Sequence, residues 1–200
     1  VTSWKDVSGS GNDADQGDSN EKPSLVDSEI NNNDAIDFSD DFLDGIAGFN
    51  TQEYFMILKP DAAIAGGASN GYVLGLQNGA YGGMYLGVQG ADTLIGHAVN
   101  DYRSAYVDGS ASIDNPVIML NSRNNIGATG QDILVDGIEL DNGEGGTFAN
   151  RTNSYFRLGD NFLGTDGYDG KISEVISFNT RLSDADHRDV ESYLAIKYGV

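Results

Sequence analysis

Several residue types are absent or scarce in this chain of 200 residues, and each scarcity excludes a class of protein. There is no cysteine, which excludes disulfides, thiolate zinc sites and cysteine nucleophiles. The two histidines, His97 and His187, have no zinc-type partner nearby in sequence, so each is interpreted as an ordinary surface or loop residue. No stretch approaches the roughly 18 apolar residues of a membrane-spanning helix, so direct membrane insertion is not expected.

Positive charge is also scarce. Eleven lysines and arginines face 31 aspartates and glutamates, which gives a formal net charge of −20. Nucleic acid and anionic membrane surfaces are therefore not expected as partners, because both attract basic residues. The acidic residues are mostly aspartate, which suits turns and hard-cation sites. Together with the missing cysteine, this composition indicates an extracellular bacterial protein that binds Ca²⁺.

Glycine is plentiful, with 27 residues against three prolines, and ten tyrosines and eight phenylalanines favour strands. Alternating or continuous apolar runs separated by turn signals predict a series of short strands. The predicted strands and hairpins cover 35–44, 53–60, 72–77, 84–89, 104–108, 116–123, 132–140, 154–159 and 170–179. We expect one all-β domain over 1–200, a two-sheet jelly-roll sandwich.

One helix is expected, at the C-terminal end. Ser183 is the predicted N-cap, Asp186 completes a weak capping box with it, and Gly199 is the predicted stop. The helix should lie on a sheet through an apolar face formed by Val190, Tyr193, Leu194 and Tyr198.

Both ends of the chain carry a family resemblance. The stretch "WKDVSGSGNDADQ" followed by "AIDFSDDFLD", and the closing stretch "YDGKISEVISFNTRLSDADHRDVESYLAIKYG", resemble laminin-G-like, concanavalin A-like jelly-roll domains of bacterial surface and secreted proteins. The resemblance implies the two-sheet fold and no particular function, since this fold carries lectins, peptide binders, spacers and hydrolases. It also makes the opening stretch a tight loop whose Asp and Asn satisfy backbone donors.

A weaker likeness is to ligand-binding modules of calcium-dependent bacterial adhesins of the RTX type. It implies a monomeric module within a longer chain, which binds a peptide or a glycan on another cell surface. On this interpretation the chain is a non-catalytic adhesion module, and Ca²⁺ organises its ligand loops.

Candidate calcium ligands lie in the loop "LGDNFLGTDGYDG", where carboxylate and amide oxygens alternate with glycine. The candidates are Asp160, Asn161, Asp166 and Asp169. Candidate ligand-binding residues come from two polar loops and from tyrosines around a hairpin bend. They are Asn70, Tyr72, Tyr81, Tyr85, Asn121, Arg123, Asn124, Gln131 and Asp132.

Two alternatives stay open from the sequence. The first is a glycoside hydrolase or polysaccharide lyase. The stretch "ELDNGE" has the spacing of a glucanase carboxylate strand at Glu139, Asp141 and Glu144, but Asn142-Gly143 is a strong turn signal that should turn Glu144 away. The second alternative is a structural spacer without a ligand.

Overall fold

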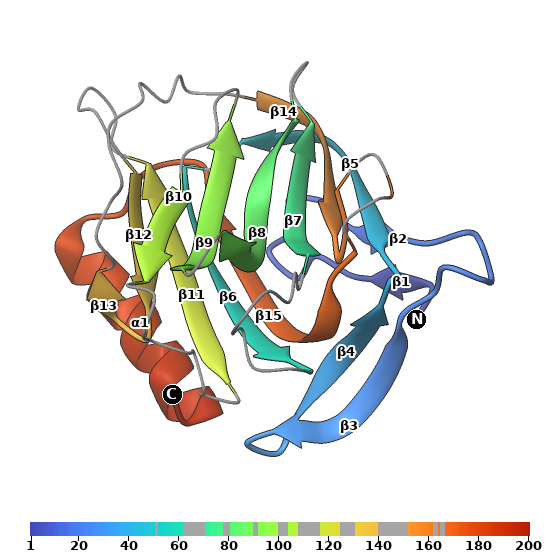
Figure 1. The fold of residues 1–200 in the computed structure, drawn as a ribbon, viewed down its shortest axis with the longest axis horizontal. Helices are drawn as coiled ribbons and strands as arrows, with labels where there is room; N and C mark the ends of the chain where they lie inside the picture. Colours follow the sequence, from blue (N-terminus) through green and yellow to red (C-terminus); the bar gives the residue numbers. More distant parts are fainter. Residues whose placement is uncertain are drawn as a thin grey trace.

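In its described residues the chain folds as two antiparallel sheets packed face to face, with helix α1 (Asp184–Tyr198) on the outer side of one sheet (Figure 1). This computed structural model describes residues 1–50, 52–61, 71–77, 81–89, 92–99, 104–107, 117–124, 131–139, 152–161, 164 and 167–200. The predicted two-sheet sandwich with a C-terminal helix is confirmed.

The first sheet, called sheet A, pairs strands from both halves of the chain. In spatial order it contains β1 (Ser3–Trp4), β2 (Ala14–Asp15), β5 (Leu43–Asn50), β14 (Thr152–Leu158), β7 (Gly71–Gln77), β8 (Tyr81–Gln89), β9 (Asp92–Val99) and β10 (Ser104–Val107). The second sheet, called sheet B, contains β13 (Ile138–Glu139), β12 (Gln131–Val135), β11 (Ile118–Asn124), β6 (Glu53–Pro60), β15 (Asp169–Phe178), β4 (Asn33–Ser39) and β3 (Ser24–Ile30). Every pairing among the described strands is antiparallel, and several neighbouring strands, such as β5 with β14 and β6 with β15, come from distant segments of the chain.

Strand β6 has a continuous apolar run in its sequence "EYFMILKP" because it is buried on both of its faces. Tyr54, Met56 and Leu58 point into the core between the two sheets. Phe55 and Ile57 point the other way and pack beneath α1. Successive side chains of a strand alternate between faces, so a strand buried on both faces needs apolar residues at every position.

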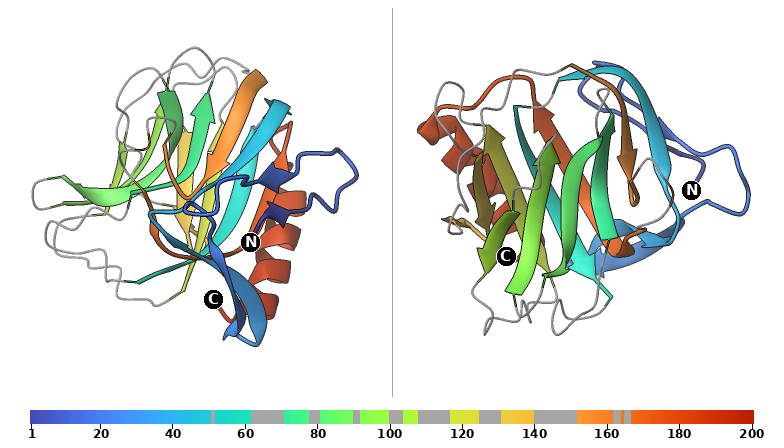
Figure 2. Two further views of the ribbon diagram at one scale, coloured as in Figure 1. Left: turned by 90° about the vertical axis from the view of Figure 1, so that its right-hand side faces the viewer. Right: turned by 45° about the horizontal axis from the view of Figure 1, so that its top comes forward.

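The second core lies between sheet B and α1, on the side away from sheet A (Figure 2, left). Leu194 and Tyr198 of the helix pack there on Phe55, Ile57 and Met119. The predicted apolar face of the helix is therefore correct for Leu194 and Tyr198. It is wrong for Tyr193, which is 47% exposed, whereas His187 is buried. Within the described residues, no helical segment combines the length and apolar character of a membrane span.

The predicted ends of α1 are confirmed. The hydroxyl of Ser183 accepts a hydrogen bond from the backbone N–H of Asp186, and Gly199 adopts a left-handed conformation with φ of 75°. The side chains of Asn31 and Asn33, at the β3–β4 turn, donate to the backbone carbonyl of Lys197. The hairpin thereby satisfies a carbonyl that the helix end leaves without an intrahelical partner.

The opening loop is organised by its own carboxylates, as the sequence predicts. The side chain of Asp6 accepts backbone hydrogen bonds from Ser8 and Asn12, and Asp13 accepts one from Asp6. The hydrogen bonds from Ser8 and Asn12 lower the pKa of Asp6.

Candidate functional site

The outer face of sheet A carries an exposed aromatic residue on β14. Tyr155 is 47% exposed, whereas Phe156 and Leu158 of the same strand belong to the core between the sheets. Because side chains alternate along a strand, Tyr155 points outward, and so does Arg157 two residues later. No described helix covers this face, since α1 lies against sheet B (Figure 2). Tyr155 and Arg157 are the centre of what we call the sheet A face.

Arg157 is held rigidly on this face. Its Nε and Nη2 atoms donate to the two carboxylate oxygens of Asp44 on β5, at 2.7 and 2.9 Å. Its Nη1 donates to the carbonyl of Asn161 at 3.1 Å. The guanidinium plane stacks on Phe42, 3.7 Å from the ring centroid. A bidentate Arg–carboxylate pair stacked on an aromatic ring has a fixed geometry, so Tyr155 has a preorganised polar neighbour.

The strand register extends the sheet A face across β7 and β8. Tyr155 pairs with Gln77, and Gln77 pairs with Tyr81. Tyr72 pairs with Tyr85 a few residues along the same two strands. Direct partners in an antiparallel ladder lie on the same face, and Tyr81 and Tyr85 are four residues apart on β8. With the register shift between Tyr72 and Leu74, the backbone register therefore places Tyr72, Tyr81 and Tyr85, three predicted ligand-binding residues, on the face that carries Tyr155. For Tyr81 and Tyr85 the structure describes the backbone.

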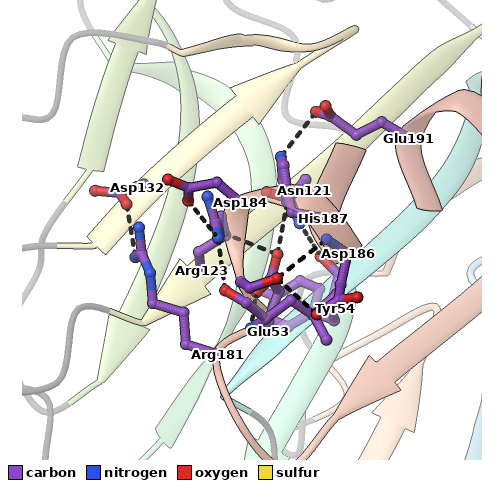
Figure 3. A network of polar contacts seen from close by, with 12 residues as sticks. Glu53, Tyr54, Asn121, Arg123, Asp132, Arg181, Asp184, Asp186, His187 and Glu191 are labelled. Atoms are coloured by element: carbon purple, nitrogen blue, oxygen red, sulfur yellow. Dashed lines mark hydrogen bonds and ion pairs between the residues drawn. The ribbon is translucent and has the colours of Figure 1, made fainter. Parts of the chain in front are cut away.

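A second polar cluster lies beneath the start of α1 (Figure 3). Glu53 of β6 is fully buried at its centre. Its Oε1 lies 2.7 Å from Nδ1 of His187 and 3.0 Å from Nε of Arg123, and its Oε2 accepts the backbone N–H of Leu182 at 2.8 Å. The Nε–H of Arg123 does not point at the carboxylate, so that approach is an ion pair and not a hydrogen bond. On the other side of the ring, Nε2 of His187 lies 3.1 Å from Glu191.

The same cluster fixes the segment that leads into the helix. The Nη2 atom of Arg123 donates to the carbonyl of Leu182 at 3.0 Å and lies 3.3 Å from Asp184. Arg181 donates to Asp132 of β12 at 2.7 Å (Figure 3). We interpret this cluster as structural because its central groups, Glu53, Arg123 and His187, are buried and lie within ion-pair distance of one another.

This cluster corrects part of the predicted ligand-binding set. Asn121 and Arg123 are 1% and 6% exposed and contact Tyr54, Glu53 and the helix start. Their burial keeps them from contacting a ligand. Asp132 is engaged by Arg181 at the edge of the same cluster. The interpretation of His187 as a surface or loop residue is also wrong, because it is 4% exposed and lies between two carboxylates.

Of the remaining ligand candidates, the two that the structure describes lie in sheet B. Asn124 pairs with Gln131 in the β11–β12 ladder of sheet B, where the structure describes their backbone. Asn70 lies outside the described residues. The predicted ligand-binding residues that the structure describes therefore divide between the two sheets.

The predicted calcium loop is partly described. Asp160 and Asn161 are buried, and Asp160 accepts the backbone N–H of Asn161 and lies 3.8 Å from Arg157. Asp169 is exposed at the start of β15, and Asp166 lies outside the described residues. Partial burial, and then the nearby charges of Asp40 and Asp61, raise the pKa of Asp169. No group of three or more His, Cys, Asp or Glu side chains in the described part of the chain could hold a metal ion. The calcium site stays a prediction.

The glucanase-like stretch is described at one residue only. Glu139 is exposed at the end of the short strand β13. Asp141 and Glu144 lie outside the described residues.

The residues that sequence reasoning missed are Tyr155 with Arg157 on the sheet A face, and Glu53 in the buried cluster. A signal for Tyr155 was present, because it alternates with the apolar residues at 156 and 158. Glu53 begins an apolar strand in register with Phe55 and Ile57, which marks it as a buried charge that needs a partner. The identity of that partner has no local signal.

No family model matches the sequence, and no curated protein is similar to it at a significant level. Solved structures are similar in fold. Domain 4 of AbnA, a GH43 extracellular arabinanase from Geobacillus stearothermophilus in complex with arabinotriose, is 16% identical, with a TM-score of 0.58 over 88% of this chain and 83% of that one. A GH54 α-L-arabinofuranosidase is 14% identical, with a TM-score of 0.67 over 99% of this chain and 51% of that one. A Trypanosoma rangeli sialidase in complex with sialic acid is 14% identical, with a TM-score of 0.64 over 96% of this chain and 31% of that one.

At these identities the likeness establishes the fold alone. The chain spans most of the arabinanase domain, about half of the arabinofuranosidase and about a third of the sialidase. The expectation that this chain is not an enzyme is contradicted, because the similar structures are mostly glycoside hydrolases and sialidases.

Proposed function

We propose that this chain is a carbohydrate-recognising β-sandwich of an extracellular glycan-acting protein, and that its sheet A face holds the sugar. The observation that carries the proposal is Tyr155, an aromatic ring left half exposed on a sheet that no described helix covers. Aromatic rings offer an apolar surface to the C–H faces of sugars, and tyrosine adds a polar tip.

The polar surroundings of Tyr155 also support the proposal. Arg157 lies two residues away on the same face, about 6.8 Å along the strand, and Asp44 holds its guanidinium in place. Binding sites for small polar ligands combine an apolar surface with a few fixed polar groups. The fold likeness to an arabinanase domain in complex with arabinotriose agrees with a sugar as ligand.

A matched pair of tyrosine variants tests the proposal. Tyr155 and Tyr193 are both 47% exposed, but Tyr193 lies on α1 at the far side of the molecule. We expect Tyr155→Ala to weaken binding of an oligosaccharide panel that includes arabinotriose by about tenfold or more. Tyr193→Ala should bind like the unmodified chain. Calorimetric titration measures both, and equal binding by all three proteins would contradict the proposed site.

Calcium-dependent adhesion to a peptide or glycan is the finer form of the proposal. It is supported by the net charge of −20 and by the raised pKa of Asp169 beside Asp40 and Asp61, because a bound cation would relieve that repulsion. Repeating the titration with calcium and with a chelator tests it. Binding that is unchanged by the chelator would separate sugar recognition from calcium.

Glycoside hydrolysis is the second candidate, favoured by the enzymes among the similar structures. That chemistry needs two carboxyl groups on opposite sides of the scissile bond. On the sheet A face, Asp15 of β2 is the direct cross-strand partner of Asp44. Turnover of the same panel, measured for the unmodified chain and for Asp15→Asn, tests this candidate. Absence of product from every sugar would exclude hydrolysis of those substrates.

A further inference from the structure

Almost every described basic side chain is already neutralised by a carboxylate. The lysines and arginines in ion pairs are Lys5, Lys59, Arg123, Arg157, Lys171, Arg181 and Lys197. Among the described residues, Lys22 and Arg188 are the basic side chains for which no ion pair is seen, and Arg188 lies on α1, away from sheet A. Arg103 and Arg151 lie outside the described residues. The described surface therefore offers few free cations.

Among the described side chains of the sheet A strands β1, β2, β5, β14 and β7, Arg157 is the only lysine or arginine, and it is paired. Asp44 takes two of its donors, while the carbonyl of Asn161 takes a third. Next to this pair, Asp15 lies directly opposite Asp44 in the β2–β5 ladder. Lys5 near Asp15 is shared with Asp13, at 2.7 Å from Asp13 and 3.7 Å from Asp15. The local balance is negative.

From this balance we infer that the sugar bound on the sheet A face is uncharged. The inference rests on the proposed function and names its ligand class, a neutral glycan as opposed to a uronic, sulfated or sialylated one. A carboxylated sugar gains most from an unpaired guanidinium or ammonium group, whereas here the charge of Arg157 is already neutralised by Asp44 and the carboxylate of Asp15 lies opposite Asp44. Like charges placed side by side at an interface oppose binding. Hydroxyl groups of a neutral sugar can accept from Arg157 or donate to Asp44 without breaking their pair.

Local charges decide this preference more than the net charge. Exposed charges are largely screened beyond a Debye length of about 8 Å at physiological salt. Asp44 lies one strand and Asp15 two strands from β14, about 4.8 and about 9.6 Å across the sheet, so both lie at about one Debye length from a sugar stacked on Tyr155 and are only partly screened. The long-range effect of the other acidic residues, 29 of the 31, is screened at physiological salt and is felt at low salt.

The test uses pairs of glycans in which one member is neutral and the other carries acidic groups. The pairs are lactose with sialyllactose, a xylo-oligosaccharide with its glucuronate-substituted form, and a galacto-oligosaccharide with the oligogalacturonate of equal length. Each is titrated calorimetrically into the unmodified chain in chelator, at low and at physiological salt. We expect a neutral member to bind and its acidic partner to bind about tenfold more weakly or worse. The difference should shrink as salt rises.

Charge variants locate the effect. Asp15→Asn removes a carboxylate beside the sheet A face, and Asp189→Asn removes an exposed one on α1 with the same change in net charge. We expect Asp15→Asn to improve binding of the acidic member and Asp189→Asn to leave the discrimination as it was. Equal effects of both variants would contradict a local origin and overturn the assignment to this face.

The outcomes separate the two proposals. Equal or tighter binding of the acidic member in chelator overturns the neutral-glycan inference and leaves sugar recognition in place. Binding of acidic glycans only when calcium is added also overturns it, because the ion would then supply the missing positive charge. If neither member of any pair binds, the proposed function fails and the inference fails with it.

Discussion

At the scale of single residues, Glu53 is the central group of the buried cluster. It is a buried charge, and its contacts hold the neighbouring groups in place. One fully buried carboxylate serves His187, Arg123 and the backbone of Leu182. Burying a charge is costly unless partners and hydrogen bonds compensate it. Glu53 therefore ties β6 to β11 and to the start of α1 at one point.

We predict that Glu53→Ala lowers the free energy of unfolding by about 3–5 kcal/mol, because Arg123 keeps a buried charge without its partner. Glu139→Ala, at an exposed position of β13, is the control and should change it by less than about 0.5 kcal/mol. Chemical denaturation measures both. In addition, the double variant Glu53→Leu and Arg123→Leu should be more stable than Glu53→Leu alone, since it removes the uncompensated charge. A double variant that is less stable would contradict this account.

Residue types alone predicted some residues of the face that we propose as the sugar site. The tyrosines near the β7–β8 bend were predicted as ligand-binding, and the register brings Tyr72, Tyr81 and Tyr85 onto one face. Asn121 and Arg123 have the same polar character but are buried. Asn121 and Arg123 are buried because their strand β11 lies in sheet B under α1. The tyrosines belong to β7 and β8, which lie in sheet A.

At the scale of elements, the packing of β5 against β14 requires a glycine at position 45. Gly45 pairs with Phe156, and the ring occupies the space where a side chain at position 45 would begin. A Cβ atom added at Gly45 would lie 1.9 Å from Cε1 of Phe156. Glycine at this position lets the aromatic ring reach the core between the sheets.

Gly45→Ala should therefore destabilise the fold by about 1–3 kcal/mol through overpacking. Gly17→Ala is the matched control, because a Cβ atom there meets no atom within 4 Å. Thermal unfolding of the two variants measures the difference. Adding Phe156→Leu to Gly45→Ala should recover part of the loss. If the two glycine variants unfold alike, the close approach has no energetic weight.

The last turn of α1 is joined to β15 by Glu174. Its carboxylate accepts hydrogen bonds from Lys197 at 2.9 Å and from Tyr198 at 2.7 Å. Burial, and then the hydrogen bond to Glu174, raise the pKa of Tyr198 to about 12. Burial alone would lower the pKa of Lys197, but its hydrogen bonds to Glu174 and the two tyrosines raise it instead.

This contact predicts an alkaline unfolding step. A tyrosine or lysine whose pKa is raised by folding stabilises the fold fully below its unfolded-state pKa, near 10 for both groups. That contribution is lost as the pH rises through the folded-state value, which is about 12 for Tyr198. We expect Glu174→Gln to cost about 1 kcal/mol at pH 7, discounted for partial exposure of Lys197. The variant should also lose less stability than the unmodified chain between pH 10 and about 12. Urea unfolding across this range checks it, and parallel curves for both proteins would contradict the assignment.

The sequence predicted many elements and missed others for a common reason. The bounds of β6 and α1 were predicted closely, because an apolar run, an N-cap serine and a terminal glycine are local signals. Strand β3 was missed because Ser24–Ile30 is mostly polar and exposed. Its pairing with β4, and not its own pattern, makes it a strand.

At the scale of the whole molecule, the excess carboxylates repel one another over the whole surface. The chain has 31 acidic and 11 basic side chains, so most carboxylates have no partner of opposite sign. Such an imbalance destabilises the compact state through self-repulsion. The individual surface ion pairs contribute little against it.

We therefore predict that added salt stabilises this protein. The midpoint of thermal unfolding should rise from low ionic strength to about 0.3 M sodium chloride. Added salt shortens the Debye length and so weakens the repulsion between the carboxylates. Calcium chloride at matched ionic strength provides a second comparison. A larger rise with calcium than with sodium would indicate specific ion binding. A midpoint that falls with salt would mean that ion pairs outweigh the self-repulsion.

The sequence by itself determined the fold class, the C-terminal helix with its ends, the strand β6 and the acidic character of the surface. These follow from periodicity, capping and composition, which act over a few residues or over the whole chain at once. Only the tertiary structure decided that β14, which carries Tyr155 and Arg157, is in one sheet with β7 and β8, which carry Tyr72, Tyr81 and Tyr85. It also decided that Glu53 meets His187, 134 residues away. Contacts of this kind depend on which strands become neighbours, and that choice is made by packing between distant segments that no local pattern encodes.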